Sequence, residues 1–424
     1  MKLTFKSMVK NAFIILGLVF LAAGCKHDPD ISQDTYHVVT PTFKAGDVYL
    51  LHSYLEGGSG DENDYYYFSS ENGGTVIVNT NISKSEYYDL AKYSFTYNSG
   101  DSKVEGNDWL SFMMVDDYVH VYNKQYCFKR QDGKTGLLGT FVSGSDKIKF
   151  SKSGTAEAYL SGHTFEVKFK NEEGVVTIWD SSSSLKFYFL KEGYLVPFNA
   201  VSSLSEADMI NIYTIMDTSD EGKKLPEFIK GLPDGLYYHL ENKTDYGAAA
   251  DLATVKEILT ENPNKKFAIT LGVANSRTYT HKEVQQFGYI KKIPSNFFEG
   301  LENLYQFAFG RLSGSSRITL EKGAFKNCKN LTKLWGSTSI SNIEESCFEG
   351  CAALEGIEIS KDSIIEPNAF KDCSSDLLLV GNGYKKVTVS EDKDFTNPID
   401  ITNHSEKKGK LITSTYVNYY WKFE

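Results

Sequence analysis

Four phenylalanines near the C-terminal end of the chain recur at a nearly regular interval. Their successive spacings are 27, 23 and 22 residues, and their positions are Phe298, Phe325, Phe348 and Phe370. A cysteine follows each of the last three after three residues, at Cys328, Cys351 and Cys373. Units of about 20–29 residues cannot bury their own apolar side, so copies must stack. The interval therefore predicts a solenoid, which offers an extended binding surface rather than a catalytic cleft.

The phase of this ladder predicts which side chains leave the core. Leu331 and Leu334 occupy the apolar positions of the repeat, so we expect their side chains to point into the core. Side chains on a strand alternate between its two faces, so their neighbours should point outward. The candidates for an outward, ligand-binding face are Tyr305, Gln306, Lys333, Trp335, Glu355 and Glu358, with Gly356 as the alternative to Glu355. Tryptophan is enriched at interface hot spots, although a tryptophan near a strand end is as often covered by a neighbouring loop.

The ladder cysteines share one repeat position, so neighbouring thiols should lie about 4.8 Å apart along the stack, within reach of a disulfide. Free cysteine also behaves as a small buried hydrophobe, and we favour structural thiols. The sequence leaves open the disulfide state of Cys328, Cys347, Cys351 and Cys373. A zinc site at Cys347 and Cys351 would need further ligands, and no histidine lies nearby in sequence. We expect no metal and no cofactor, and we expect Cys127 to be buried alone.

Three segments resemble the BspA-like leucine-rich repeat: residues 293–304, 323–334 and 347–357, in which Phe, Cys or Leu, and Leu keep one phase. The resemblance covers about residues 290–383. It departs from the pattern in the long first interval and at Asp376, where leucine is expected. It implies an α/β leucine-rich-repeat solenoid in a bacterial surface or secreted protein, a family in which some members are adhesins that bind host proteins.

The first residues have the pattern of an export signal. Three lysines precede an apolar run, residues 12–23, that is too short to span a bilayer. Residues 21–25, Leu-Ala-Ala-Gly-Cys, resemble the lipobox of bacterial lipoproteins. The resemblance implies that residues 1–24 are a lipoprotein signal peptide and that Cys25 is acylated. An ordinary secretory signal with a chance cysteine is the alternative.

We therefore expect a protein that is lipid-anchored at the outer membrane or cell surface of a Gram-negative bacterium. Residues 25–42 are polar and predict a tether. The sequence does not decide which leaflet carries the anchor.

Residues 43–196 predict an antiparallel β-domain, a sandwich or a barrel. Residues 165–170 alternate apolar and charged side chains, and Gly- and Asn-containing turn signals recur between such runs. The strand rhythm of residues 139–190 is similar to that of lipocalin-like domains. Five aromatic residues are candidates either for a ligand site or for the core: Tyr65, Tyr66, Tyr67, Trp109 and Trp179.

Residues 197–231 are expected to be a linker with a short helix from Ser205 to Met216. A second helix, capped by Asp251 and ended by Asn262-Pro263, precedes a strand at residues 267–271. This pair predicts an N-terminal cap for a leucine-rich-repeat domain that spans residues 232–390. Residues 391–424 are expected to form a C-terminal β cap.

Charge and motifs exclude two large classes of function. The net charge of −10 is the wrong sign for binding phosphate backbones. The sequence contains neither an HExxH motif nor a Gly-x-Ser-x-Gly elbow, and we expect no enzyme. The leading hypothesis is a surface lipoprotein that binds a protein or glycan through its solenoid, in adhesion or host interaction. The alternative is a glycan-binding component of a nutrient-uptake system, with the ligand site in the N-terminal β-domain.

Overall fold

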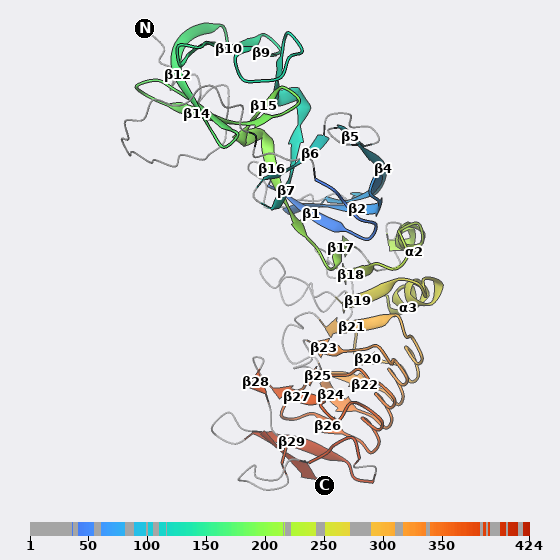
Figure 1. Ribbon diagram of the computed structural model, residues 1–424. Coiled ribbons are helices and arrows are strands. Elements are labelled where there is room, and N and C mark those ends of the chain that lie inside the picture. The colour runs from blue at the N-terminus through green and yellow to red at the C-terminus, as the bar shows by residue number, and fades with distance from the viewer. Residues whose placement is uncertain are drawn as a thin grey trace, which may run out of the picture. The chain divides into compact units, whose positions relative to one another are not determined.

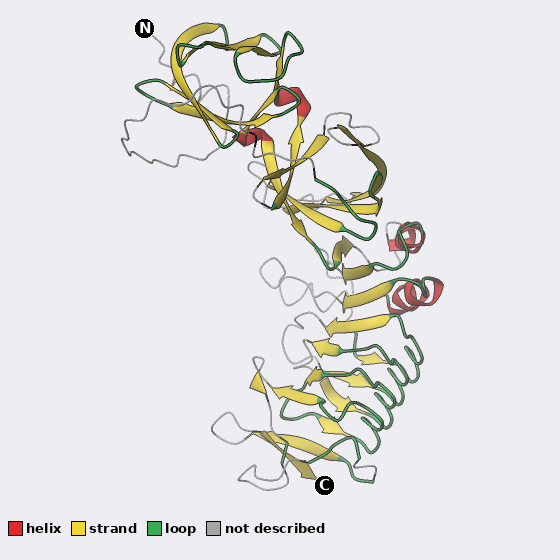
Figure 2. Cartoon of the chain, viewed as in Figure 1, coloured by secondary structure: helices red, strands yellow, loops and turns green. Residues whose placement is uncertain are grey.

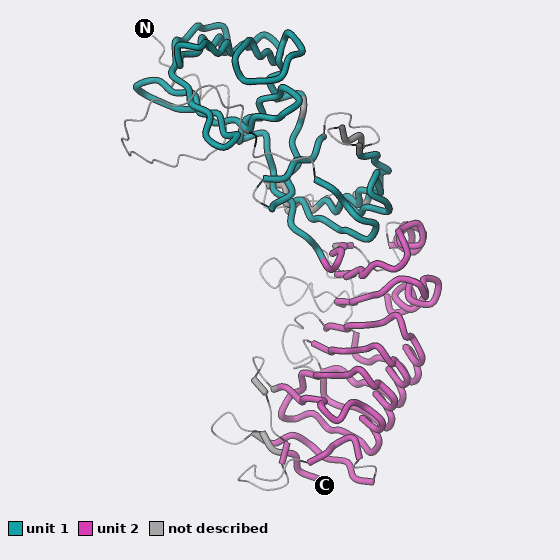
Figure 3. The backbone as a smooth tube through the Cα atoms, in the orientation of Figure 1, with its two compact units in different colours: residues 1–83, 91–207 teal, residues 84–90, 208–424 magenta. Residues whose placement is uncertain are grey.

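The computed structural model describes residue 36 and the following ranges: 41–54, 61–80, 89–98, 101–104, 110–115, 117–214, 216, 222–242, 251–271, 290–309, 317–335, 340–381, 385–386, 389–390, 399–403, 406–413 and 419–424. The expected signal peptide, Cys25 and most of the expected tether lie outside the described residues. The chain divides into two compact units, residues 1–83 with 91–207 and residues 84–90 with 208–424 (Figure 3). Each unit is described by itself.

The first unit contains an open eight-stranded sheet with the strand order β5-β4-β3-β2-β1-β16-β7-β6. Its strands are β1 (Val48–Tyr54), β2 (Asp61–Ser70), β3 (Gly73–Thr80), β4 (Asp89–Asn98), β5 (Asp101–Val104), β6 (Leu110–Val115), β7 (Tyr118–Asn123) and β16 (Val201–Glu206). Aromatic rings fill its core, with Phe43 stacked on Phe68 at 3.7 Å between ring centroids. Tyr66, Phe95 and Phe112 belong to the same cluster.

A closed barrel forms the rest of the first unit, with the order β10-β11-β12-β13-β14-β15-β8-β9 (Figure 1). Its strands are β8 (Phe128–Arg130), β9 (Gly139–Ser143), β10 (Asp146–Phe150), β11 (Thr155–Leu160), β12 (His163–Glu172), β13 (Val175–Trp179), β14 (Ser184–Leu190) and β15 (Tyr194–Pro197). Short 3-10 turns, η1 (Lys124–Tyr126) and η2 (Phe198–Ala200), flank β8 and β15. The alternation in residues 165–170 has its expected result, because Val167 and Phe169 are buried.

The barrel interior is occupied by the protein's own side chains. Phe141, Phe150, Phe169, Phe187 and Phe189 belong to one buried apolar cluster. Eight strands leave an interior just wide enough for side chains to fill, and here they do.

Tyr65 and Tyr66 of β2 are fully buried, which confirms the core interpretation for both. Tyr67 and Trp179 are half-buried, and Trp109 lies outside the described residues. The expected single domain of residues 43–196 is thus an open sheet followed by a barrel, and β16 extends the open sheet beyond residue 196.

The second unit consists of two sheets that share one core. The larger has the order β17-β18-β19-β21-β23-β25-β27-β28, in which all pairs are parallel except β27 with β28. Its strands are β17 (Ile210–Thr214), β18 (Tyr237–Asn242), β19 (Lys266–Leu271), β21 (Leu304–Phe309), β23 (Lys333–Trp335), β25 (Gly356–Glu358), β27 (Leu378–Gly381) and β28 (Lys385–Lys386).

The smaller sheet has the order β20-β22-β24-β26-β29-β30. Its strands are β20 (Lys292–Ile293), β22 (Ile318–Leu320), β24 (Ile340–Ile343), β26 (Ile364–Ile365), β29 (Gly409–Thr413) and β30 (Tyr419–Phe423). The first four pair in parallel, whereas β29 and β30 pair antiparallel to the end of the stack. The last hairpin therefore ends this sheet with antiparallel rather than parallel pairs.

In the described part of this unit the helices are η3 (Gly222–Lys224), α2 (Leu225–Lys230) and α3 (Leu252–Glu261) (Figure 2). The predicted helix after Asp251 is confirmed as α3, whose first turn donates backbone N–H groups of Ala253 and Thr254 to the Asp251 carboxylate. The predicted strand at residues 267–271 is confirmed as part of β19.

The predicted helix from Ser205 to Met216 is wrong. This stretch contains the end of β16 and all of β17, in place of the short helix expected there. Ile210 and Ile212 alternate into the core, and β17 pairs with β18 along its length. Pairing with a neighbouring strand overrides a weak local helical preference.

The phenylalanine ladder is confirmed. Neighbouring ring centroids lie 5.3, 5.3 and 5.4 Å apart from Phe298 through Phe370. All four rings are at most 1% exposed. In the described repeats, residues 290–309, 317–335 and 340–381, turns rather than helices connect the strands, which corrects the expected α/β character.

Candidate binding face and the turns that position it

Each repeat turn contains two residues with positive φ, placed two residues before and two residues after the ladder phenylalanine. The first column is Asn296, Gly323, Ser346 and Asn368, and the second is Gly300, Asn327, Gly350 and Asp372. Glycine, asparagine and aspartate tolerate this left-handed backbone better than most residues. Two such residues within five positions prevent a helix, which explains the turns.

A carboxylate ladder links each turn to the preceding one. The glutamate four residues before the phenylalanine accepts a backbone N–H from the preceding repeat: Ser295 to Glu321 at 3.1 Å, Lys322 to Glu344 at 3.0 Å and Glu345 to Glu366 at 3.2 Å. The Lys292 ammonium and the Ser295 donors hold the pKa of Glu321 below its usual value. These bonds fix the spacing of consecutive turns.

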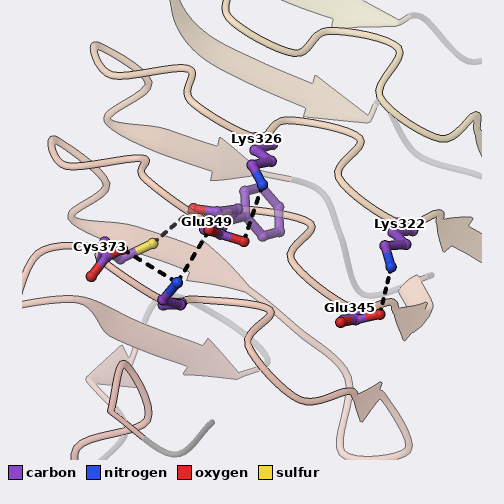
Figure 4. Close-up of polar contacts among 8 residues, drawn as sticks. Lys322, Lys326, Glu345, Glu349 and Cys373 are labelled. Carbon is purple, nitrogen blue, oxygen red and sulfur yellow. Dashed lines mark hydrogen bonds and ion pairs between the residues drawn. The ribbon is translucent and has the colours of Figure 1, made fainter.

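Ion pairs cross between the same turns. Figure 4 shows the Lys322–Glu345 pair and the contact of Lys326 with Glu349, at 2.8 and 3.3 Å. Lys371 approaches Glu349 from the next repeat at 3.4 Å. Each exposed pair contributes little to stability. Their regularity nevertheless shows that the charged side chains of these turns are paired with one another. We call this row of turns, around residues 295–302, 322–329, 345–351 and 366–372, the turn edge.

The ladder thiols are free and each donates to the preceding repeat. The acceptors are the carbonyl oxygens of Phe298, Phe325 and Phe348, at 2.9, 3.0 and 3.1 Å from the sulfurs of Cys328, Cys351 and Cys373. Burial raises the pKa of Cys328 and Cys373 to about 12 and raises that of Cys347 and Cys351 as well. These thiols are structural and stay protonated. Cys127 is buried too, as expected.

This stacked core fixes one surface of the larger sheet, which we call the outward face: the residues of β17 to β27 that alternate with buried ones. The strand register places two rows across it. One row is Asn211, His239, Ala268, Gln306, Lys333, Gly356 and Leu378. The other includes Glu241, Thr270, Ala308 and Trp335.

Gln306, Lys333 and Trp335 lie in the two rows of the outward face, and Tyr305 adjoins them at the register shift opposite Phe267 and Ala268. Tyr305, Gln306, Lys333 and Trp335 are half-buried, while the intervening Phe307 and Leu334 are fully buried. The Lys333 ammonium lies over the Trp335 ring, 5.4 Å from its centroid. The strand ladder therefore brings an aromatic, an amide and a cation together on β21 and β23.

The other two candidates are placed differently. Glu358 is only 9% exposed, so it is not the freely projecting residue that alternation predicted. Glu355 is exposed but precedes β25, and Gly356 takes the position opposite Lys333. Alternation along a strand gives the direction of a side chain, but the neighbouring segments of the protein decide whether that side chain is covered.

Sequence reasoning missed the beginning of the outward face. The ring of His239, on β18, lies between Asn211 and Thr270. Its Nδ1 is 2.9 Å from the Asn211 Oδ1, and its Nε2 is 2.7 Å from the Thr270 Oγ1. Burial lowers the pKa of His239, so the ring is neutral near pH 7. The side-chain amide oxygen of Asn211 can only accept a hydrogen bond. Nδ1 of His239 therefore donates to it, and Nε2 accepts from the Thr270 hydroxyl. The alternation of residues 237–242 was the available signal.

Two tyrosines and a lysine adjoin this network. The Tyr237 and Tyr305 rings lie 5.7 Å apart, and the Lys266 ammonium is 5.6 Å from the Tyr305 ring centroid. Burial, and then the neighbouring Tyr305, raise the pKa of Tyr237 to about 12. The outward face thus combines aromatic rings, hydrogen-bonding groups and two lysines.

Among the described residues, no cluster of His, Cys, Asp or Glu is arranged to hold a metal ion. Of the helices in the described parts of the chain, none combines the length and apolarity of a membrane span.

Residues 278–399 match the family model for the BspA type leucine rich repeat region, in six copies. The match extends at both ends beyond the four phenylalanine-centred units recognised in the sequence. It does not include the first unit, and the lipocalin-like resemblance has no support. No curated protein and no solved structure matches the chain.

Proposed function

We propose that the BspA-type leucine-rich repeat region at residues 278–399, with the strands that precede it, binds a protein or glycan partner through the outward face. The observation that carries this proposal is the clustering of Tyr305, Gln306, Lys333 and Trp335 on adjacent strands. Tyrosine and tryptophan are enriched at recognition sites. The role is adhesion or host interaction, and the chain is not an enzyme.

Rigidity of the face supports this proposal. Behind it, the phenylalanine ladder, the thiol donors and the turn carboxylates repeat once in each unit. Side chains held by such a core lose little freedom when a partner binds, and preorganisation favours affinity. The alternative, a glycan site in the N-terminal β-domain, is less well supported because Tyr65 and Tyr66 are buried and the barrel interior is filled.

The test compares the face with the turn edge in the full chain. Replacing Tyr305 and Trp335 together by alanine is expected to weaken binding to the partner found in a panel of proteins and glycans by about tenfold or more. Replacing Lys329, which pairs with Glu302 on the turn edge at 2.8 Å, by glutamine should leave it unchanged. Surface plasmon resonance measures both affinities. Undiminished binding of the double variant, with circular dichroism unchanged, would refute the role of the face.

We also propose that the protein is an outer-membrane or surface lipoprotein anchored through Cys25, which lies outside the described residues. The lipobox-like Leu-Ala-Ala-Gly-Cys at residues 21–25 supports this. Several acyl chains anchor strongly, because burial contributes about 0.8 kcal/mol per methylene.

Replacing Cys25 by serine is therefore expected to abolish membrane association, since it removes the acyl acceptor of the signal. Fractionation and palmitate labelling of cells that express either protein would measure this. A Cys127→Ser variant is the matched control and should remain in the membrane fraction. Salt-resistant association of the Cys25→Ser protein would contradict the lipid anchor.

A further inference from the structure

Lysines at two places in the second unit, the turn edge and the outward face, differ in what they contact. Those on the turn edge are paired with carboxylates of neighbouring repeats, as shown by the distances from Lys292 to Glu321, Lys322 to Glu345, Lys326 to Glu349, Lys329 to Glu302 and Lys371 to Glu349, which run from 2.7 to 3.4 Å. The repeat stack thus satisfies these cations internally.

Lys266 and Lys333 on the outward face differ. Neither forms an ion pair with a carboxylate among the described residues. Each ammonium instead lies over a ring, that of Tyr305 at 5.6 Å and that of Trp335 at 5.4 Å. The chain has 55 acidic and 45 basic residues, so scarcity of carboxylates does not explain two unpaired lysines.

The ring contacts hold both ammonium groups on the outward face. An aromatic ring attracts a cation without neutralising its charge, so the positive potential stays directed at solvent. Lys266 is the exposed member and Lys333 is half-buried. Of the described carboxylates on the same face, Glu358 is 9% exposed and Glu241 is half-buried, so among the described residues the accessible charge between β19 and β23 is positive.

The strand register sets the distance between the two lysines. Lys333 lies opposite Gln306, and Gln306 lies opposite Ala268, two residues after Lys266. Two strand spacings and a two-residue offset separate the Cα atoms by about 12 Å. An extended peptide advances about 3.3–3.6 Å per residue, so carboxylates three to four residues apart match both lysines.

We propose that the outward face recognises an acidic segment of a partner protein, in which carboxylates about three to four residues apart contact Lys266 and Lys333 and an intervening side chain packs on Tyr305 or Trp335. This rests on the proposed function of the face and adds the chemistry of its partner. Charge complementarity specifies the acidic residues. The enrichment of tyrosine and tryptophan at protein interfaces favours a protein over an acidic glycan.

The experiment uses the full purified chain and three probes: a random copolymer of glutamate and tyrosine, polygalacturonate as an acidic glycan, and polylysine. We expect the wild-type chain to bind the Glu–Tyr copolymer, more weakly as salt is raised, and to bind neither of the others. The Lys266→Glu/Lys333→Glu variant should lose about tenfold or more in affinity. Lys266→Arg/Lys333→Arg should retain binding, and Lys329→Gln on the turn edge is the matched control.

The outcomes separate this proposal from the function on which it rests. Failure of the wild-type chain to bind the copolymer, or equal binding by the charge-reversed variant, overturns the acidic-segment proposal. Binding of polygalacturonate alone also overturns it and identifies an acidic glycan instead. If Tyr305→Ala/Trp335→Ala loses the screened partner while charge reversal keeps it, the face still functions but the inference falls. Near-ultraviolet circular dichroism checks that each variant is folded.

Discussion

Replacement of Phe348 by alanine is expected to lower the free energy of unfolding of the second unit by about 3–5 kcal/mol, the range typical of a buried phenylalanine. The ring is 0% exposed and lies between two others, 5.3 Å from Phe325 and 5.4 Å from Phe370. Its neighbours belong to adjacent repeats whose backbones are joined by turn hydrogen bonds, so they cannot collapse into the cavity. The loss includes a cavity term as well as the transfer term.

Amide hydrogen exchange of the full chain measures this effect and locates it. Protection should fall in residues 317–381 and stay unchanged in the barrel. Phe141→Ala is the matched control, because Phe141 is also 0% exposed but packs in the barrel against Phe150 and Phe189. It should lower protection by a similar amount in the barrel strands alone. A change near zero for Phe348→Ala would show that the ring stack does not hold the repeats together.

The sequence predicted the repeat stack well because one constraint acts on every unit. Phe298, Phe325, Phe348 and Phe370 must all meet the same core, so a single phase located the buried rings and the thiols behind them. The turn columns were predictable too, since Gly300, Asn327, Gly350 and Asp372 are residue types that tolerate positive φ. Periodicity gives information wherever the environment repeats.

The outward face was predictable only in direction. Phe307 and Leu334 fixed its phase, from which Gln306, Lys333 and Trp335 followed, whereas Tyr305 meets the face only through the register shift between β19 and β21. The burial of Glu358 depends on segments that are distant in sequence and close in space, and the local sequence pattern does not show them. His239 was missed because its partners Asn211 and Thr270 are 28 and 31 residues away and meet it only through parallel pairing.

The helix predicted near Ser205 failed for a related reason. Its apolar residues, Ile210 and Ile212, suit a short strand as well as a helix, and only the neighbouring β18 decides between them. In the first unit, alternation predicted the strands but could not tell a sandwich from a barrel. That choice depends on whether the first and last strands pair with each other, as β8 and β15 do in the closed barrel.

Replacement of Gly74 by alanine is expected to destabilise the first unit by about 3 kcal/mol or more, because the added methyl group forces backbone atoms apart. Gly74 lies in β3 opposite Phe68, next to a register shift in the β2–β3 pair. A Cβ atom there would overlap the Tyr67 carbonyl oxygen and lie 2.8 Å from the Tyr67 carbonyl carbon and 2.9 Å from the Phe68 Cα. All three are backbone atoms of a paired strand, so relief requires β2 and β3 to separate.

Such separation would also disturb the core, because Tyr66 and Phe68 of β2 are buried in the aromatic cluster of the open sheet. Gly356→Ala is the matched control: this glycine also lies in a strand, β25, but its nearest contact for a Cβ is the Leu378 carbonyl oxygen at 3.8 Å. That change should be neutral or stabilise by about 0.4–1 kcal/mol, since alanine has fewer unfolded conformations. Denaturant unfolding of both variants, followed by tyrosine fluorescence, measures the difference. Equal stabilities would mean that β2 and β3 do not approach each other as closely at Gly74 as the structure shows.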